Sequence, residues 1–443
     1  MNCSRKYVYA CLCFLTLVIA EAHYLGARTQ GKAESAAAVN PRLSAPYAPA
    51  LLAPAEISVH AKSAVLMDAT TGEILLAHNP DQGIPPASFA KLLTLYVTFD
   101  MMKHQKLRLV DEVFVSKKAW RTGGSKMFIE VNSKVPVEEL IKGIAIVSGN
   151  DACVAMAEHL SGDTATFTKV MNKYAQQLGM DNSHFSNPHG LPEEEQLTTA
   201  RDMAILARSY INNFPEALQY HSMLEFTYSD ITQKNRNGLL RKSNFVDGLK
   251  TGWVEKSGYN LLATAMKDNQ RLIAVVMGAK NVNTREKEAL KLFNYGYQNF
   301  SLLSFFEEGQ VLTEIPVWKG KSNTLSIIPQ QNSLLVIPRE YENKINKMSS
   351  LPADIVAPVQ KGQVVGEYVI TIGTQLLKSI PLIAAESVGK AGFFKALSHQ
   401  MYLYGRKAKM RWFILTGSIV SLGTVAILAL RGKFRRKRSG FRF

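Results

Sequence analysis

The sequence predicts an α/β domain whose single sheet is assembled from distant parts of the chain, followed by a smaller all-β domain. Between residues 57 and 304, short strand-like runs stand at both ends and helical patterns fill the middle, which is typical of a sheet covered by helices. Between residues 305 and 385, short apolar runs alternate with Gly, Pro, Asn and Lys, which indicates a β-rich unit. A chain of 443 residues also exceeds one ordinary hydrophobic core, so two domains are expected.

Hydrophobic spacing predicts the elements of both domains. Two apolar runs, 63–68 and 73–77, flank a Thr-Thr-Gly turn and predict a β-hairpin. Apolar residues at helical spacing predict helices at 89–102, 137–160, 165–178, 200–211 and 285–299. Strands are predicted at 259–265 and 272–277, and in the second domain at 311–317, 333–337, 362–372 and 376–381. The second domain contains no metal-ligand or catalytic cluster in its sequence, and we expect no metal or cofactor in either domain.

The N-terminal end indicates export. Two basic residues precede a short apolar run, so residues 1–22 are predicted to be a signal peptide, with an uncleaved anchor helix as the alternative. Residues 23–56 are rich in Ala, Pro and small polar residues and are predicted to be a linker. The domains that follow are therefore expected outside the cytoplasm.

The C-terminal end indicates a membrane anchor. Residues 412–430 are 19 residues without a charge, about 28 Å as a helix, and predict a transmembrane helix. The basic tail 431–443 belongs on the cytoplasmic side, which places the rest of the chain on the far side of a bacterial inner membrane. Residues 386–411 mix aromatic and basic residues and predict an amphipathic juxtamembrane helix, so the lipid bilayer is an expected partner.

The distribution of charge argues against a nucleic-acid partner. The net charge is +16, but eleven Lys or Arg and no acidic residues follow Gly405, and the first 22 residues add one more positive charge. The stretch between them carries only about +4, so the basicity belongs to the membrane end. Three of the four cysteines lie in the signal segment, which leaves Cys153 alone, with no disulfide possible, and predicts that it is a buried core residue.

A serine and a lysine three residues apart open the first predicted helix. A three-residue step on a helix places Ser88 and Lys91 on one face, so the lysine can take the proton from a serine nucleophile. The pattern alone is weak, because about two such pairs are expected by chance at average composition. The chain contains a second pair, Ser387 and Lys390, and the local pattern does not choose between them.

Two further short segments have both chemical and structural interpretations. Ser148-Gly149-Asn150 can present a hydroxyl as a proton relay and an amide to the substrate, but it can equally be the N-cap of the next helix. Lys250-Thr251-Gly252 suits a substrate carboxylate beside a strand edge, although a similar Lys256-Ser257-Gly258 follows and either can be a surface turn.

Taken together and in this order, the three segments are specific. S-x-x-K, S-x-N and K-T-G form the set found in penicillin-binding proteins and class A β-lactamases. Residues 61–299 resemble the low-molecular-mass penicillin-binding proteins that act as D-alanyl-D-alanine carboxypeptidases. The segments that carry this resemblance are Pro86–Lys91, Gly123–Phe128, Ser148–Ala157, His189–Leu191, Ala200–Ala204 and Val246–Gly252. Residues 305–381 resemble the β-rich second domain of that family. The resemblance implies a β-lactamase/transpeptidase-like fold with a central antiparallel sheet flanked by helices, and it excludes Ser387 and Lys256 from the site.

The resemblance also implies roles for the site residues. Ser88 is the expected nucleophile, Lys91 its base, with a pKa lowered by burial and by the Lys250 ammonium, and Ser148 the proton relay. The remaining residues are expected to bind substrate: Asn150, Lys250, Thr251, Gly252, Trp253 and Arg285. The N–H groups of Ser88 and Trp253 form the expected oxyanion hole, and Arg285, in Thr284-Arg285-Glu286, matches the segment whose arginine binds the terminal carboxylate.

Two features depart from the family pattern. A true membrane span follows the usual amphipathic helix, and Trp253 stands where a smaller or polar residue is expected after the K-T-G, which alters the rim of the cleft. The expected partners are peptidoglycan stem peptides and β-lactam antibiotics. The alternatives are a D,D-endopeptidase that cuts peptide crosslinks, a β-lactamase, and a non-catalytic wall-associated protein.

Overall fold

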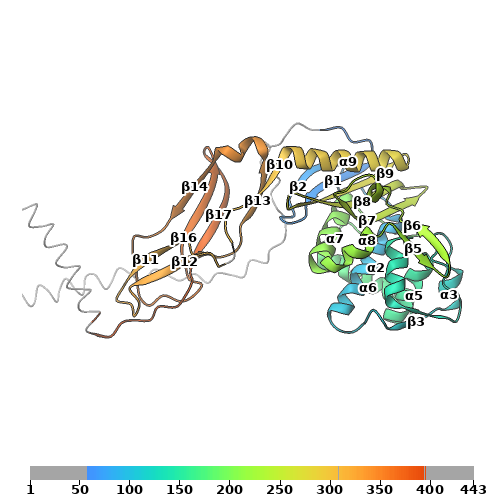
Figure 1. Ribbon diagram of the computed structural model, residues 1–443, viewed down its shortest axis with the longest axis horizontal. Helices are drawn as coiled ribbons and strands as arrows, with labels where there is room; N and C mark the ends of the chain where they lie inside the picture. Colours follow the sequence, from blue (N-terminus) through green and yellow to red (C-terminus); the bar gives the residue numbers. More distant parts are fainter. Residues whose placement is uncertain (1–56, 308, 394, 396–443) are drawn as a thin grey trace, which may run out of the picture. The chain divides into compact units, whose positions relative to one another are not determined.

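The computed structural model describes residues 57–307, 309–393 and 395 (Figure 1). The predicted signal peptide 1–22, linker 23–56, span 412–430 and tail 431–443 lie outside the described residues, as does most of the predicted juxtamembrane helix 386–411. Within the described residues, no helix has both the length and the apolar character that crossing a membrane requires.

The first domain is built on a five-stranded antiparallel sheet with the order β2-β1-β9-β8-β7. Its strands are β1 (Ser63–Asp68), β2 (Ile74–His78), β7 (Val246–Val254), β8 (Gly258–Lys267) and β9 (Gln270–Ala279). The predicted hairpin is β1–β2, and β1 pairs with β9, with Ser63 opposite Met277. The prediction of one sheet assembled from distant parts of the chain is therefore confirmed.

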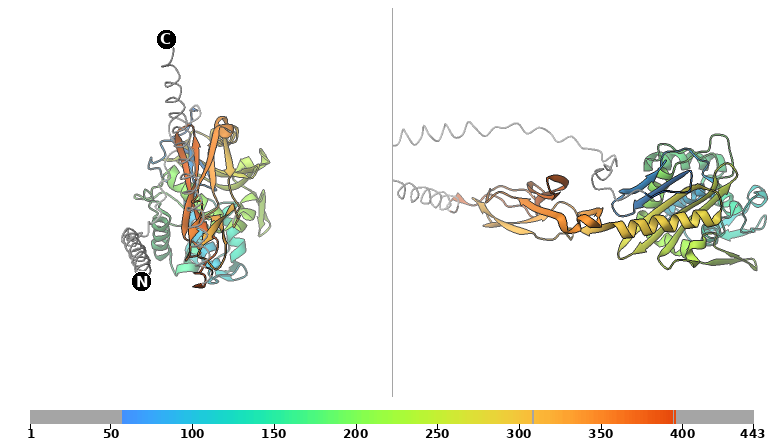
Figure 2. Two further views of the ribbon diagram at one scale, coloured as in Figure 1. Left: turned by 90° about the vertical axis from the view of Figure 1, so that its left-hand side faces the viewer. Right: turned by 90° about the horizontal axis from the view of Figure 1, so that it is seen from above.

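Helices cover both faces of this sheet (Figures 1 and 2). One face carries α9 (Val282–Asn299), and the other faces a helical group: α2 (Ala90–Lys103), α3 (Lys117–Arg121), α4 (Val137–Ala145), α5 (Asn150–Ser161), α6 (Thr164–Leu178), α7 (Ala200–Asn213) and α8 (Leu218–Ser222). Alternate strand residues point to opposite faces. Leu262 and Val275 accordingly join the core beneath the helical group, whereas Leu261 and Val276 join the core beneath α9.

Polar caps fix where several of these helices begin. The Asp163 carboxylate accepts hydrogen bonds from the backbone N–H groups of Ala165 and Thr166 at the start of α6. Thr199 caps α7 in the same way, and Asn281 caps α9. Such caps pair the N–H groups that the first turn of a helix leaves without a partner.

One predicted helix was wrong. The pattern at 137–160 is two helices, α4 and α5, separated by a turn at residues 146–149. Ser148 lies in the left-handed region with φ +66°, a conformation that ends a right-handed helix. The apolar residues on both sides of the break are buried, so their spacing alone looked continuous.

Short hairpins and 3₁₀ turns complete the first domain. The hairpins are β3 (Glu112–Phe114) with β4 (Lys134–Pro136), and β5 (Glu225–Tyr228) with β6 (Ile231–Lys234). The 3₁₀ turns are η2 (Ala87–Phe89), η3 (Pro215–Ala217) and η4 (Gly238–Arg241). Of these, η2 places the candidate nucleophile.

The second domain is all-β apart from one 3₁₀ turn, η5 (Arg339–Lys344), as predicted. A six-stranded sheet has the order β14-β16-β17-β12-β11-β15, and β10 pairs with β13. The strands are β10 (Phe300–Ser304), β11 (Thr313–Trp318), β12 (Thr324–Pro329), β13 (Leu334–Pro338), β14 (Ile345–Ser350), β15 (Ile355–Val356), β16 (Val364–Ile372) and β17 (Gln375–Ala384). The prediction for residues 305–385 missed β12, β14 and the two-residue β15. Of these, β14 is an edge strand whose residues are mostly exposed and therefore lack an alternating apolar pattern.

Candidate active site

The Ser88 hydroxyl and the Lys91 ammonium meet at the junction of η2 and α2. Lys91 Nζ lies 2.8 Å from Ser88 Oγ, as the three-residue step predicted, and 2.6 Å from the carbonyl oxygen of His189. Pro86 precedes the turn with a helical φ, and Ala87 is held at φ +48° directly before the serine. A non-glycine residue in that region stores strain and is most often found at functional sites.

Lys91 is completely buried, and burial sets its charge state. Removal from water lowers its pKa from 10.5 to about 8, while Cys153 and Asp151 oppose that shift. A depression of this size costs the charged form roughly 3 kcal/mol. A base near neutral pH is what a serine nucleophile requires, because the amine must be uncharged to accept a proton.

Two glycines let backbone pack directly against the nucleophile. A Cβ on Gly252 of β7 would lie 3.2 Å from the Ser88 nitrogen, so the K-T-G edge runs beside the serine. Gly190 has φ +84°, and a Cβ there would overlap the carbonyl oxygen of Ala87. Only glycine fits both the conformation and the space at Gly190.

The turn between α4 and α5 carries Ser148 and Asn150. Ser148 is buried, and its hydroxyl has no hydrogen-bond partner within the described residues. The alternative interpretation as an N-cap fails, because Gly149 is the cap residue of α5 and no side chain caps that end. The Asn150 amide donates to the carbonyl oxygen of Gly123 at 2.7 Å, which orients it from the 123–128 loop.

A buried carboxylate holds that loop in place. Asp151 accepts hydrogen bonds from the backbone N–H groups of Met127, Phe128 and Ala152 at 2.9–3.0 Å, with Ile129 more distant. Charge-assisted bonds to backbone donors are among the stronger ones in proteins. These hydrogen bonds join the Ser148-Gly149-Asn150 turn and the 123–128 loop into one unit beside the nucleophile.

Lys250 is the second buried cation. It lies on β7, the edge strand of the sheet, and its ammonium donates to the carbonyl oxygen of Thr251 at 3.1 Å. Burial lowers the pKa of Lys250 well below its usual value, and repulsion from Lys91 lowers it further. The expected lowering of the Lys91 pKa by Lys250 is not among the causes of the Lys91 shift; burial is the main cause at both lysines.

Arg285 lies on the first turn of α9, buried against β8, the strand that pairs with β7. Its Nη1 and Nη2 reach the carbonyl oxygens of Asn260 and Arg236, each at 3.4 Å, and its Nε has no partner within the described residues. These long contacts leave the guanidinium able to accept a better ligand, and a carboxylate matches its paired donors.

Trp253 lies directly after Gly252 on the rim. Its side chain is 55 % exposed, and its ring packs against Tyr259 with centroids 6.0 Å apart. Because β7 is an edge strand, alternate N–H groups along it face away from β8. That this residue alters the rim of the site stays a prediction.

The two alternative motif segments, 387–390 and 256–258, lie outside the site and form structural hydrogen bonds. Ser387 and Lys390 are exposed at the end of the β domain, where Ser387 Oγ accepts from the backbone N–H of Lys361 at 2.9 Å. Lys256 is exposed in the turn between β7 and β8, and Ser257 bonds to backbone carbonyls there. Cys153 is buried as predicted, and burial raises its pKa to about 12, which makes the thiol unreactive.

Three residues that contribute to the candidate site were given no role in the sequence analysis: His189, Asp151 and Arg236. The segment around His189 resembled the family, but a backbone carbonyl as a lysine partner has no sequence signal. Asp151 follows Asn150 directly, and its burial is what marks it. Arg236, exposed in the 235–237 segment, contributes to lowering the pKa of Lys250 and had no pattern around it.

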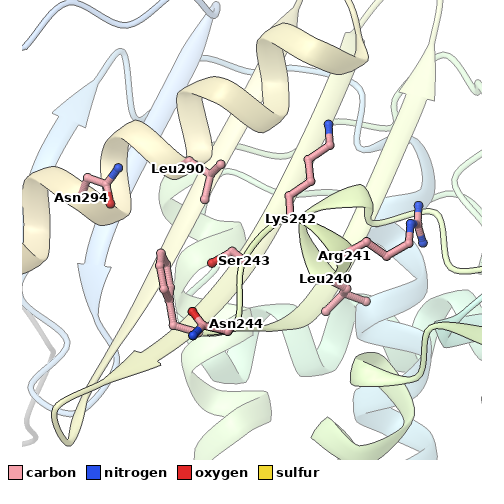
Figure 3. Close-up of a pocket in the computed structure, with 8 residues that line it drawn as sticks. Leu240, Arg241, Lys242, Ser243, Asn244, Leu290 and Asn294 are labelled. Carbon is pink, nitrogen blue, oxygen red and sulfur yellow. The ribbon is translucent and has the colours of Figure 1, made fainter.

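A second hollow lies between α9 and the segment that leads into β7 (Figure 3). Its volume is about 590 Å³, and it is lined by Leu240, Arg241, Lys242, Ser243, Asn244, Phe245, Leu290 and Asn294. Its Lys242 is paired with Glu286 at 2.6 Å. Within the described residues, no group of three His, Cys, Asp or Glu is placed to hold a metal ion.

Fold and site together define a class of protein. A serine beside a buried lysine, a Ser-x-Asn turn and a second buried lysine on an adjacent sheet edge are the parts of a serine acyl-transfer enzyme.

Comparison with known proteins gives the family. Residues 50–281 match the family described as D-alanyl-D-alanine carboxypeptidase, and residues 300–390 match the C-terminal domain of penicillin-binding protein 5. The D-alanyl-D-alanine carboxypeptidase DacA of Haemophilus influenzae is 40% identical over 345 residues, which are 76% of this chain and 88% of that protein. DacC of Escherichia coli is 38% identical over 76% of this chain and 86% of its own length.

A solved structure gives the same result. The crystal structure of penicillin-binding protein 5 from Haemophilus influenzae aligns with a TM-score of 0.70 and 38% identity, covering 76% of this chain and all of that one. The chain belongs to the D-alanyl-D-alanine carboxypeptidase family of serine hydrolases and has the penicillin-binding protein fold, with a C-terminal all-β domain.

Proposed function

We propose that this protein removes the terminal D-alanine from peptidoglycan stem pentapeptides through an acyl-enzyme on Ser88, and that penicillin acylates the same serine. The 2.8 Å contact between Lys91 Nζ and Ser88 Oγ carries the proposal. Burial of Lys91 supports it, because the lowered pKa makes the uncharged amine accessible near neutral pH.

The reaction proceeds in two balanced steps. Ser88 Oγ attacks the carbonyl carbon of the penultimate D-alanine while its proton passes to Lys91 Nζ. The peptide C–N bond then breaks, and the leaving D-alanine amine takes a proton through Ser148. Water attacks the resulting ester, which yields the shortened peptide carboxylate and restores the Ser88 hydroxyl. The N–H groups of Ser88 and Trp253 stabilise the oxyanion in each step.

The same assignment gives the substrate-binding residues. Arg285, Thr251 and Lys250 hold the terminal carboxylate of the substrate, and Gly252 lets the peptide lie against the β7 edge. The Asn150 side chain hydrogen-bonds the peptide backbone. The buried guanidinium of Arg285 supports its role, because its protein contacts are long and a carboxylate can form stronger, charge-assisted hydrogen bonds with it.

The test is release of D-alanine from a pentapeptide that ends in D-Ala-D-Ala. The proposal expects one equivalent of D-alanine per peptide from the unsubstituted protein and none from Ser88→Ala. Release of a larger fragment from a crosslinked dimer, with no release from the pentapeptide, would replace this activity with an endopeptidase. Rapid turnover of penicillin, in place of a long-lived adduct, would favour a β-lactamase.

We also propose where the protein works and how it is divided. The signal-like segment 1–22, the apolar stretch 412–430 and the basic tail 431–443 support a protein anchored in the bacterial inner membrane by one C-terminal span. Segment 386–411 is then a helix on the membrane surface, and residues 23–56 are a linker. The catalytic domain is 57–304 and the β-rich domain 305–385, both on the periplasmic side.

Cell fractionation tests this location. The full-length chain is expected in the membrane fraction, with its catalytic domain cleaved by protease added to spheroplasts. A chain ended at residue 411 is expected to leave the integral membrane fraction. Retention of the truncated chain after a high-pH wash would contradict the assigned span.

A further inference from the structure

Trp253 is an exposed aromatic residue at the rim of the candidate site. Its side chain is 55 % exposed, although the residues before it on β7, from Gly248 to Gly252, are buried. Large exposed aromatics set beside a reactive centre commonly serve recognition rather than folding. Its position directly after the K-T-G segment makes it a neighbour of the bound peptide.

The register of β7 fixes which face of the strand the indole occupies. Gly252 faces the nucleophile, since a Cβ there would lie 3.2 Å from the Ser88 nitrogen. Side chains alternate along a strand, so Trp253 shares the opposite face with Thr251. On β8, Tyr259 pairs with Trp253 and Leu261 pairs with Thr251, and both partners pack into the core beneath α9.

Arg285 reaches that same face from α9. Its Nη1 contacts the carbonyl oxygen of Asn260, the residue next to Tyr259. Burial lowers the pKa of Arg285, while Glu286 and the Tyr259 phenol oppose that shift, which is consistent with the phenol lying near the guanidinium. Thr251, Trp253, Tyr259 and Arg285 therefore lie on one face of the β7–β8 strand pair.

The indole is held in position by its neighbour. Its ring centroid lies 6.0 Å from that of Tyr259 at an interplanar angle of 45°, and Tyr259 is itself partly buried against the core. Contacts of this kind stabilise aromatic pairs beyond their buried area. The ring therefore packs against Tyr259 on one side, and more than half of the side chain is exposed to solvent.

The Trp253 ring lies where the terminal residue of the substrate peptide, the residue released by the reaction, is expected. If Thr251 and Arg285 hold the terminal carboxylate, as the proposed function has it, the leaving residue lies along the edge of β7. Trp253 is two residues further along the same face, about 7 Å away at the usual rise of a strand. A methyl group on the leaving residue would fit beside the ring, whereas a branched or extended side chain would clash with it.

We propose that the Trp253 side chain, backed by Tyr259, is a specificity-determining wall that restricts the leaving residue to a small side chain such as that of D-alanine. The inference rests on the proposed function and deepens it. It makes the protein a carboxypeptidase in preference to an endopeptidase, because the residue that leaves a crosslink carries a side chain joined to a second peptide.

The test compares two peptides that differ only in the leaving residue, D-alanine or D-leucine. The ratio of kcat/KM for the D-leucine peptide to that for the D-alanine peptide is expected to rise at least about tenfold in Trp253→Ala, the lower end of the effect of one methylene in a hydrophobic pocket. Trp253→His, with a smaller ring, is expected to give an intermediate ratio. Labelled penicillin, which counts active sites, is used to normalise each preparation.

Phe114→Ala is the matched control, because Phe114 is also 55 % exposed but lies on β3. It is expected to keep the ratio of the unsubstituted protein. A ratio in both Trp253 variants within twofold of the unsubstituted protein, at equal active-site counts, would overturn the inference. Absence of D-alanine release from the unsubstituted protein would instead overturn the proposed function.

Discussion

The chain contains the same four-residue pattern twice, and the two copies differ in their surroundings. Ser88 and Lys91 lie on successive turns at the start of a helix, with the ammonium fully buried and 2.8 Å from the hydroxyl. Ser387 and Lys390 lie at the end of the β domain, both exposed, and Val388 between them is paired with Val359. In extended chain, residues three apart point in different directions.

The comparison shows that burial, together with helical geometry, makes the pair reactive. A lysine in water stays charged at neutral pH and is a poor base. Lys91 gains its lowered pKa from the core around it, and Ser88 is held by strained backbone and by the close approach of Gly190 and Gly252. The predictions below test each part of this difference.

Removing the two serines separately gives the largest expected contrast. Ser88→Ala is expected to abolish the covalent adduct with labelled penicillin, because the attacking oxygen is gone. Ser387→Ala is expected to keep it in full, since that hydroxyl only accepts a bond from the Lys361 N–H. The adduct is read by fluorescence after denaturing electrophoresis. Equal labelling of both variants would remove the distinction between the two copies.

Removing the two lysines tests the base. Lys91→Ala is expected to slow penicillin acylation by about 10²–10⁴-fold, the usual contribution of a positioned general base. Lys390→Ala is the matched control and is expected to acylate at the rate of the unsubstituted protein. The second-order rate constant of acylation is the measurement. A loss below tenfold in Lys91→Ala would mean that another group takes the serine proton.

The pH dependence tests the burial of Lys91. Its uncharged form increases as pH rises through its pKa of about 8, so acylation is expected to fall about tenfold per pH unit below 8 and to level off above it. His189 does not compete as the titrating group, because burial lowers its pKa to about 3. A rate measured from pH 6 to 10 that is flat, or that rises toward acid, would contradict this assignment.

Replacing Asp151 tests how the 123–128 loop is held in place, and a smaller effect is expected. Asp151→Asn replaces an acceptor oxygen by an amide that faces backbone N–H groups, and is expected to lower the free energy of unfolding by about 1–3 kcal/mol. Asp181→Asn, at an exposed aspartate, is the control and is expected to change it little. Urea unfolding of the two variants measures both values. Equal stability would show that the carboxylate is dispensable to the loop.

Much of the fold could be predicted because the hydrophobic periodicity of a segment and the cap or turn residues at its ends indicated the same element. The β1–β2 hairpin, helices α2, α6, α7 and α9, and strands β8 and β9 all have continuous apolar patterns bounded by caps or turns. The site could be predicted as three segments in order, because each needs particular residue types. The break at Ser148 was missed in the helix prediction, because the apolar residues on both sides of it are buried and their spacing continues across it.

Other parts of the site depend on tertiary contacts that leave no local trace. The K-T-G segment lies inside β7, a strand that the apolar pattern did not predict, because its buried residues include the polar Lys250 and Thr251. The carbonyl of His189 is set beside Lys91 by the fold of a loop 98 residues away. The exposed Trp253 was noticed only as a departure from the expected residue type.

The most direct test is to locate the penicillin adduct by mass spectrometry after trypsin digestion of the full chain. The penicilloyl group is expected on the peptide 63–91, with fragment ions that assign it to Ser88. An adduct on the peptide 379–390, which contains Ser387, or on any other serine, would contradict the assignment of Ser88 as the nucleophile.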